Sequence, residues 1–410
     1  MQPLDRSDQY QDQTGFIDVK KLIAAYSFDE HVQRADDYFK SIENPWVHQL
    51  RKPFHEFQDS RATLAGFAAV LDVAKLRAGH RVVDFGCGTG WLSMALALMR
   101  CTPIGLDVSQ EALNIARSAV DEHPLLRTLD IAFDVIGETM IGLEDASVDR
   151  IICFDSFHHV SDQATYLKEF HRILKPGGLA VFHEPGPRHS ASKASQDEMA
   201  NFAVIENDIV IEDIAQIAQA IGFQDLRLAA FTDTPILLDM GTYLRGVERR
   251  GGLGFYHRMG KALMAQGYEK RVFVMRKAGE TDADSRFPER LGAKVTVKAH
   301  NFDPASRVLS AEVSVKNTGN GLWLASGAAA GAVNLAATVV QAHGTQRSEA
   351  ARFPIAPTDT PAGMEQLVKV ALEIPAAYGE AFIVELDLVS ELITWFSEQG
   401  LSPTLIHQVP

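Results

Sequence analysis

The sequence has little cysteine, no concentrated positive charge and no long apolar run. Three cysteines occur among 410 residues, and no two of them form a C-x-x-C pair. An odd number of cysteines near the expected core fits a reducing compartment, so we expect a cytoplasmic protein without disulfides. No apolar run approaches the about 18 residues of a membrane span, and the first residues lack the basic and apolar regions of a signal peptide. We therefore expect neither a membrane span nor a secretory leader.

The charge balance also excludes a class of partner. Lysine and arginine number 39 against 53 aspartates and glutamates, which gives a net charge of −14, and the basic residues form no cluster. A protein that binds DNA or RNA usually carries a basic patch, so we expect no nucleic-acid partner. The hydrophobic content of 46% and the charged content of 22% are typical of a globular protein, and the length suits about two domains.

One stretch, residues 82–107, combines the features of a nucleoside-binding unit. A short apolar strand leads to Asp84, and a glycine-rich turn joins it to an apolar helical segment. Glycine lacks a Cβ, so such a turn can approach a ligand closely, and the following helix offers free N–H groups. A second strand ends at Asp107, whose carboxylate can accept hydrogen bonds from both ribose hydroxyls. This frame alone suits any nucleoside cofactor.

The spacing of the glycines separates these cofactors. A dinucleotide fingerprint reads G-x-G-x-x-G and places a pyrophosphate over the helix N-terminus. Here the glycines read G-x-G-x-G after Asp84, an acid that repels a pyrophosphate but suits a cationic amino group. This pattern resembles the D-x-G-x-G-x-G motif of class I S-adenosylmethionine (SAM) methyltransferases. Residues 105–109 resemble the ribose-binding motif of that family, and residues 148–160 resemble its fourth strand.

The resemblance implies a fold and a cofactor for residues 61–277. The implied fold is α/β, a Rossmann-like sheet of seven strands that binds SAM across its strand ends. By this resemblance, Asp84 would face the methionyl amino group and Asp107 would hold the ribose hydroxyls. Either Glu138 or Asp134 would contact the adenine amino group. The predicted cofactor-binding residues are Asp84, Gly86, Cys87, Gly88, Gly90, Asp107, Val108, Glu138 and Asp155. We expect no metal site.

Titratable residues gather after the expected fourth and fifth strands, where open parallel sheets bind ligands. His158 and His159 follow the fourth strand, and Glu184 and His189 follow the fifth, which faces the transferred methyl group in the family. A hydroxyl acceptor has a pKa well above 7, so O-methylation gains from a base beside it. We predict Glu184, His189 and His158 as catalytic residues. The alternatives are that Glu184 caps the next helix, that His189 lies in an exposed loop, and that the histidine pair is not catalytic.

Two further segments have open interpretations. Residues 1–60 are expected to form an N-terminal helical extension, in which residues 44–57 make either a lid over the acceptor mouth or a helix pair on the sheet edge. An insert at residues 232–266 precedes the last, antiparallel strand at residues 268–276. Its basic residues either hold an anionic part of the acceptor or face solvent; they are Arg245, Arg249, Arg250 and Arg258.

The period of the sequence changes after a polar linker at residues 278–289. In residues 290–410, apolar and polar residues alternate in short runs separated by turn residues, a pattern typical of an antiparallel, immunoglobulin-like β-sandwich. The runs VKNTGNGLW and LDLVSELITWFSEQGLSP resemble a module of bacterial polysaccharide and O-antigen biosynthesis enzymes. Trp323, Trp395 and Phe396 either stack on sugar rings or fill the sandwich core.

These features predict a SAM-dependent methyltransferase. We expect O-methylation of a sugar or glycan precursor in polysaccharide biosynthesis, from the sandwich module and the histidine- and glutamate-rich segment. One alternative is methylation of a small lipid or secondary metabolite, with the sandwich as a dimerisation module in a homo-oligomer. The other is a glycan-binding protein without catalysis. The sequence leaves the acceptor and the methylated atom open.

Overall fold

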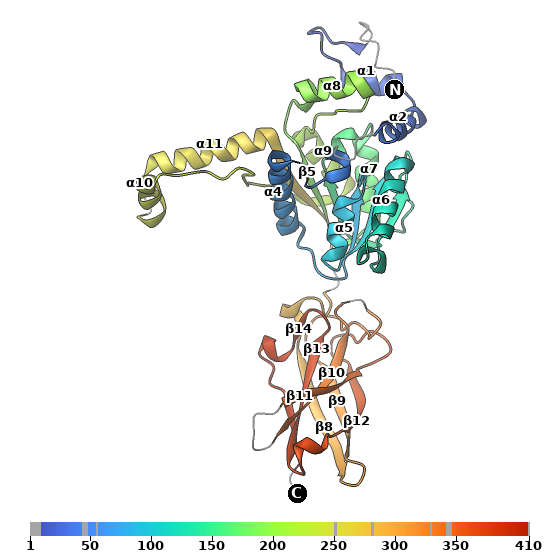
Figure 1. Cartoon of the computed structure of the whole chain (residues 1–410), viewed down its shortest axis with the longest axis vertical. Helices are drawn as coiled ribbons and strands as arrows, with labels where there is room; N and C mark the ends of the chain where they lie inside the picture. Colours follow the sequence, from blue (N-terminus) through green and yellow to red (C-terminus); the bar gives the residue numbers. More distant parts are fainter. Residues whose placement is uncertain are drawn as a thin grey trace. The chain divides into compact units, whose positions relative to one another are not determined.

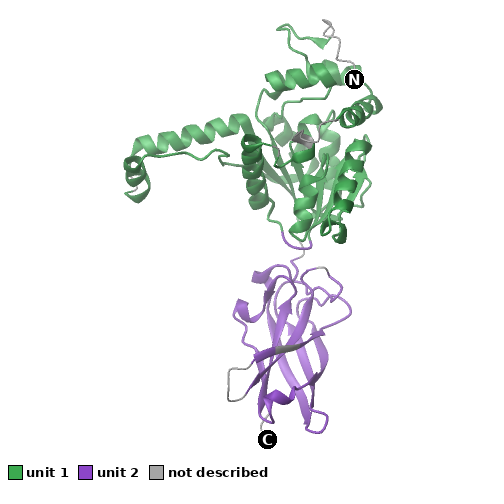
Figure 2. Ribbon diagram, in the orientation of Figure 1, with its two compact units in different colours: residues 1–76, 80–279 green, residues 77–79, 280–410 purple. Residues whose placement is uncertain are grey.

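The computed structural model describes residues 10–42, 48–54, 56–249, 252–279, 283–328, 330–341 and 347–408. The chain divides into two compact units. Unit 1 comprises residues 1–76 and 80–279, and unit 2 comprises residues 77–79 and 280–410 (Figure 2).

Unit 1 is built on a seven-stranded sheet, which confirms the predicted Rossmann-like architecture. Its strand order is β3-β2-β1-β4-β5-β7-β6, and all neighbours are parallel except β7, which runs antiparallel to β5 and β6. The strands are β1 (Arg81–Phe85), β2 (Thr102–Asp107), β3 (Ala132–Val135), β4 (Val148–Phe154), β5 (Leu174–Pro185), β6 (Phe223–Ala229) and β7 (Lys270–Lys277). The predicted turn at residues 175–178 is instead the beginning of β5.

Helices cover both faces of this sheet because its strands are apolar on both sides. Val82, Ile152 and Val181 pack on one face with α4 (Phe57–Ala74) and α5 (Trp91–Leu98). Val83 and Ile151, which alternate with them, pack on the opposite face with α7 (Gln163–Ile173) and α9 (Ile211–Ile221). The helix α6 (Gln110–Glu122) begins at its N-cap Ser109, directly after β2. The carboxyl ends of β1, β2, β4 and β5 therefore meet at one edge.

The N-terminal helices add a separate layer. The helices are α1 (Val19–Ala25), α2 (Phe28–Lys40) and α3 (His48–Arg51), and Ser27 and Glu30 form a capping box at the beginning of α2. Leu22 of α1 packs with Met199 of α8 (Lys193–Phe202), so this extension contacts the segment that follows β5. Trp46 and His55, which belong to the expected lid, lie outside the described residues.

The insert before β7 forms a helical arm. It contains α10 (Met240–Tyr243) and α11 (Leu253–Glu269), which run outward from the sheet of unit 1 in Figure 1. Several large apolar side chains of the arm are exposed: Leu237, Met240, Leu253, Tyr256, Met264 and Tyr268. Arg250 of the predicted basic set lies outside the described residues. No described helix combines the length and the apolar character that crossing a membrane requires.

Unit 2 consists of antiparallel strands around one apolar core. One sheet has the order β12-β9-β8, and the other has β11-β10-β13-β14 with β15 paired to β13. The strands are β8 (Ala293–Asp303), β9 (Val308–Asn317), β10 (Val333–Gln341), β11 (Arg347–Pro354), β12 (Glu365–Glu373), β13 (Phe382–Ser390), β14 (Thr394–Trp395) and β15 (Thr404–Gln408). Buried side chains from both sheets form a single cluster. The immunoglobulin-like character of this unit stays a prediction.

Candidate functional site

The glycine-rich turn is held against β2 and leaves one glycine facing open space. The backbone N–H groups of Gly86 and Cys87 donate to the carbonyl of Leu106 at 2.7 and 2.9 Å. A Cβ on Gly86 would lie 2.4 Å from Cβ of Ser156, so this position has no room for a side chain. Gly88, with a φ of +52°, has nothing within 4 Å of its Cβ direction. The turn is therefore packed on one side and open on the other.

Two predicted acids, Asp107 and Asp84, lie next to this turn. The Asp107 carboxylate accepts from the backbone N–H of Gly88 at 2.8 Å and from that of Ser109 at 2.9 Å. Asp84 is buried and accepts a hydrogen bond from the Ser93 hydroxyl at 2.7 Å. Burial raises the pKa of Asp84 to about 7 against the lowering effect of Ser93, and burial also raises the pKa of Asp107. The open glycine and the two carboxylates fit a cofactor with ribose hydroxyls and an amino group.

Three other residues of the predicted cofactor set differ in exposure. Val108 lies beside Asp107 and is half-buried, and Cys87 is a buried thiol whose pKa is raised by its burial. Glu138 is exposed on the loop after β3. Burial, together with the negative charge of Glu138, raises the pKa of Tyr166 to about 12. The Tyr166 hydroxyl donates to the carbonyl of Gly137 at 2.9 Å. Glu138 therefore has the solvent access that contact with a ligand needs, and its role stays a prediction.

Asp155, predicted to bind the cofactor, lies among lysine and histidine side chains, and its cofactor role stays a prediction. It follows β4 with a φ of +53°, and its carboxylate forms ion pairs with Lys270 and, at 3.8 Å, with Lys52. His183 Nδ1 lies 3.3 Å from Asp155 Oδ1 without a hydrogen-bonding geometry. Burial alone would raise the pKa of Asp155, but Lys270, His183 and Lys52 hold it well below its usual range. Two lysines thus share one carboxylate, an arrangement that sequence reasoning did not foresee.

Aromatic rings form a wall beside these lysines. Phe154 stacks on His183 with ring centroids 4.1 Å apart, and Trp91 meets the edge of Phe154 at 5.3 Å. On the other side, α4 approaches so closely that a Cβ on Gly66 would lie 2.3 Å from Nε2 of His183. The lysine pair and these rings lie on the α4 face of the strand ends.

Glu184 was predicted to contact the acceptor, and the structure gives it other partners. Its side chain has no exposed surface. It accepts from the backbone N–H groups of Ser156, Phe157 and His158, and its Oε2 lies 2.7 Å from Nδ1 of His158. Burial raises the pKa of Glu184 to about 7, and burial lowers that of His158 well below its usual value. Glu184 therefore caps the turn that carries His158 and orients this imidazole, whereas the next helix, α8, is capped by Ser192.

The predicted histidines converge on an acid that sequence reasoning missed. Nε2 of His189 lies 2.7 Å from Oε2 of Glu206, and Nδ1 of His159 lies 3.4 Å from Oε1 of the same residue. The rings of His158 and His159 are 3.9 Å apart, and those of His158 and His189 are 4.8 Å apart. Burial alone would raise the pKa of Glu206, but the hydrogen bond from His189 and the nearby imidazoles lower it to about 2.

Glu206 belongs to a short acidic run, Glu206-Asn207-Asp208, which comes before a helix without being part of it. Residues 203–210 form no helix or strand, and α9 begins only at Ile211. Asn207 fixes the segment, because its backbone N–H donates to the carbonyl of His158 at 2.9 Å and its side-chain amide donates to that of Val160 at 2.7 Å. The acidic run is therefore held in a fixed segment before α9, and its Glu206 is buried.

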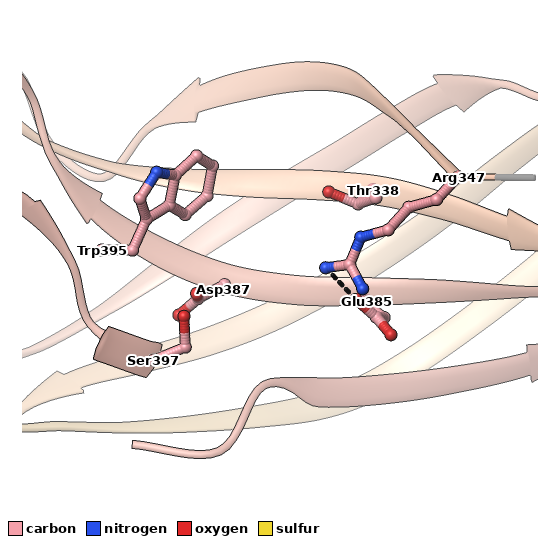
Figure 3. A pocket seen from close by; sticks show the side chains of 6 residues that line it. All are labelled: Thr338, Arg347, Glu385, Asp387, Trp395 and Ser397. Carbon is pink, nitrogen blue, oxygen red and sulfur yellow. Dashed lines mark ion pairs between the residues drawn. The ribbon is translucent and has the colours of Figure 1, made fainter. Parts of the chain in front are cut away.

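Unit 2 has a polar cavity of its own. It has a volume of about 440 Å³ and is lined by Thr338, Arg347, Glu385, Asp387, Trp395 and Ser397 (Figure 3). Arg347 pairs with Glu385 at 2.5 Å across it. Three aromatic residues were predicted either to stack on sugars or to fill the core. Trp323 and Phe396 fill the core, since each is 1% exposed and their rings pack edge to face.

Comparison with known proteins identifies the part of unit 1 that holds the glycine turn. Residues 83–182 match the family model described as a methyltransferase domain. This part of the chain is a methyltransferase domain, and SAM is its cofactor. The matched range runs from β1 to the end of the apolar part of β5, so it includes Asp84, the glycine turn, Asp107 and the histidine pair.

The methyltransferase domain has relatives of known name. The ubiquinone biosynthesis O-methyltransferase of Paraburkholderia phymatum is 33% identical over 132 residues, which are 32% of this chain and 53% of that protein. That of Ralstonia nicotianae is also 33% identical over 132 residues, 32% of this chain and 51% of that protein. The chain thus spans about half the length of these relatives.

Solved structures include similar methyltransferases. A SAM-dependent methyltransferase from Mesorhizobium loti is 19% identical, with a TM-score of 0.40, and the match covers 52% of this chain and 98% of the other. One from Aquifex aeolicus is 17% identical, with a TM-score of 0.38, over 59% of this chain and 97% of the other.

Proposed function

We propose that this protein is a SAM-dependent O-methyltransferase that acts on a small hydroxylated acceptor. The observation that carries the proposal is the match of residues 83–182 to a methyltransferase domain, in which Asp107 holds the open Gly88 turn at 2.8 Å. The relatives are named as O-methyltransferases, which favours oxygen as the acceptor atom. Bound SAM supplies an electrophilic methyl group, so the protein has to position the acceptor, exclude water and remove a proton.

His189 is the base in this proposal. Glu206 is ionised at neutral pH and accepts the hydrogen of Nε2, which leaves Nδ1 of His189 with the lone pair that takes a proton. The side chain of His189 is 21% exposed and that of His158 is 6% exposed, so His189 is the more accessible of the two. His158 and Glu184 are then positioning residues, because Glu184 holds the turn and the first imidazole in place.

The lysine pair defines one side of the acceptor site in this proposal. The ammonium groups of Lys52 and Lys270, which share the Asp155 carboxylate, favour an acceptor oxygen that becomes anionic as its proton leaves. Phe154 and Trp91 supply an apolar wall next to these charges. A partly apolar acceptor with a hydroxyl or carboxylate group suits such a surface.

Two acceptor classes remain as proposals. A sugar or glycan precursor is supported by the cavity of unit 2, in which Trp395 offers an aromatic face beside Asp387 and Glu385. A small lipid or secondary metabolite is supported by the names of the relatives, which place O-methylation in ubiquinone biosynthesis, and by the apolar wall at Phe154. In both cases the acceptor is not a nucleic acid. A homo-oligomer and a cytoplasmic location stay predictions.

Methyl transfer from isotopically labelled SAM to a panel of sugar nucleotides, glycolipids and phenols tests the function. We expect turnover with one class, and a fall of about 10² to 10⁴ in kcat for His189→Ala with unchanged SAM affinity. His257→Ala, an exposed histidine of α11, is the matched control. Absence of SAM binding by the wild type would remove the enzyme proposal, and full turnover by His189→Ala would remove only the base.

A further inference from the structure

Three metal-ligating side chains of unit 1 converge beside the methyltransferase domain's cofactor turn. His158, His159 and Glu206 each offer one ligand atom, and these three atoms lie within 4.8 Å of one another. Among the residues that the structure describes, this is the one group of three or more such side chains in this arrangement. The two histidines end the turn after β4, and Glu206 comes from the segment between α8 and α9.

Each of the three side chains is oriented by a second partner. Nδ1 of His158 faces the Glu184 carboxylate at 2.7 Å, and Nδ1 of His159 faces the carbonyl of Ile205 at 2.7 Å. Because a carboxylate and a carbonyl only accept, each Nδ1 carries the hydrogen and each Nε2 keeps its lone pair. The second oxygen of Glu206 accepts from His189. Histidine ligands of metals are held by carboxylates and carbonyls in this way.

We propose that His158, His159 and Glu206 bind one divalent transition-metal ion of the zinc class. Two neutral imidazoles and one carboxylate suit Zn²⁺, Fe²⁺ or Co²⁺, whereas Mg²⁺ and Ca²⁺ select oxygen ligands and would bind weakly. The ligand atoms of the three side chains lie within 4.8 Å of one another, close enough for one ion to reach all of them.

The position of the ion suggests its use, and this step rests on the proposed function. The turn that carries the histidine pair packs against the cofactor turn, because a Cβ on Gly86 would lie 2.4 Å from Cβ of Ser156, two residues before His158. Three protein ligands leave an open coordination position, as in catalytic zinc sites. An acceptor hydroxyl that occupied this position would ionise more readily, and it would lie beside the cofactor. The substrate class is therefore an acceptor with an oxygen that can ligate the ion.

Zinc binding by the full chain tests the site independently of any reaction. After treatment with a chelator, the protein is titrated with Zn²⁺ in competition with a chromophoric chelator, and Co²⁺ absorption reports the ligand geometry. We expect one ion per chain with a Kd below about 1 μM, and no displacement by millimolar Mg²⁺. Glu206→Gln and the more exposed His159→Ala should each weaken binding at least roughly 100-fold. His300→Ala, an exposed histidine of β8, is the control.

The outcomes separate the site from the function. A site with the expected stoichiometry and variant effects supports the proposal even if no methyl transfer is found, in which case only the proposed function fails. Absence of saturable Zn²⁺ binding at 100 μM, or unchanged binding in His159→Ala, would overturn it even if methyl transfer proceeds. Thermal unfolding of both variants shows whether they are folded, and His159→Ala keeps the test valid if Glu206→Gln does not fold.

Discussion

Replacing Asp107 by alanine should weaken SAM binding at least about 100-fold. The carboxylate accepts two backbone hydrogen bonds, from Gly88 and Ser109, and keeps two further lone pairs for the ribose hydroxyls. A hydrogen bond to a charged group contributes about 1.5–3 kcal/mol, so losing two removes about 3–6 kcal/mol, and about 1.4 kcal/mol corresponds to a tenfold change in Kd. Because water hydrogen-bonds to the ribose hydroxyls in the variant, we take the lower end of this range of lost binding free energy. Release of the Gly88 turn would weaken SAM binding further.

Calorimetric titration of SAM and of its demethylated product into wild type, Asp107→Ala and Asp107→Asn measures this effect. The titrations are run at pH 8, because burial raises the pKa of Asp107 and the carboxylate must be ionised. Asp121→Ala, an exposed acid on α6, is the matched control and should bind as the wild type does. If Asp107→Ala stayed folded and bound SAM within fivefold of the wild type, the assignment of the cofactor frame would be refuted.

Three further predictions concern the turn, a buried acid and unit 2. Gly88→Ala should lose SAM affinity, because its methyl group enters open space, and should lose about 1–2 kcal/mol of stability, because its φ of +52° is left-handed. Gly86→Ala should lower Tm further, because its Cβ would also clash at 2.4 Å. Asp84 has a pKa of about 7 when folded against an ordinary value of 3.8, so its proton is lost on unfolding and the unfolding free energy falls as pH rises through that window. Urea unfolding at pH 5 and at pH 8 measures the decrease in unfolding free energy between these pH values. This decrease should be about 3 kcal/mol smaller in Asp84→Asn than in the wild type. Trp323→Ala should destabilise unit 2 by about 3–5 kcal/mol in thermal unfolding, whereas Trp395→Ala should change its stability little and weaken any glycan binding.

The cofactor frame was predictable because its signals are local. Asp84, the glycine turn and Asp107 lie within one strand–turn–helix–strand unit, and each residue type has a backbone or charge requirement that spacing reveals. The antiparallel β7 was predicted from its apolar pattern for the same reason. These features depend on neighbours in sequence, which a pattern contains.

The acceptor side could not be predicted to the same degree, since its partners are distant in sequence. Lys52 and Lys270 meet at Asp155 only after three separate segments have packed, and neither lysine lies in a recognisable motif. Glu206 was visible only as part of a charged run, which equally suits a solvated helix start. Its burial against His189 follows from the path of residues 203–210, which no periodicity encodes.

Unit 2 shows another limit of pattern reasoning. The strands β10 and β13, which are central in their sheet, are rich in apolar residues and belong to the short runs expected in residues 290–410. The strand β11 was missed, because Arg347–Pro354 is an edge strand rich in charged and small residues. Edge strands often carry charge, which discourages pairing with other chains but also removes the apolar alternation that identifies a strand.

The position of β7 in the sheet determines when its neighbouring strands can pair during synthesis of the chain. Since β7 pairs with both β5 and β6, these two strands have open edges until Lys277 has been synthesised. From the end of β6 this takes 277 − 229 = 48 residues, or about 2 to 10 s at ordinary translation rates. The apolar residues of α11 emerge in the same interval. For these seconds the nascent chain offers unpaired edges of β5 and β6 to its surroundings, and such edges are sites of aggregation or of chaperone capture.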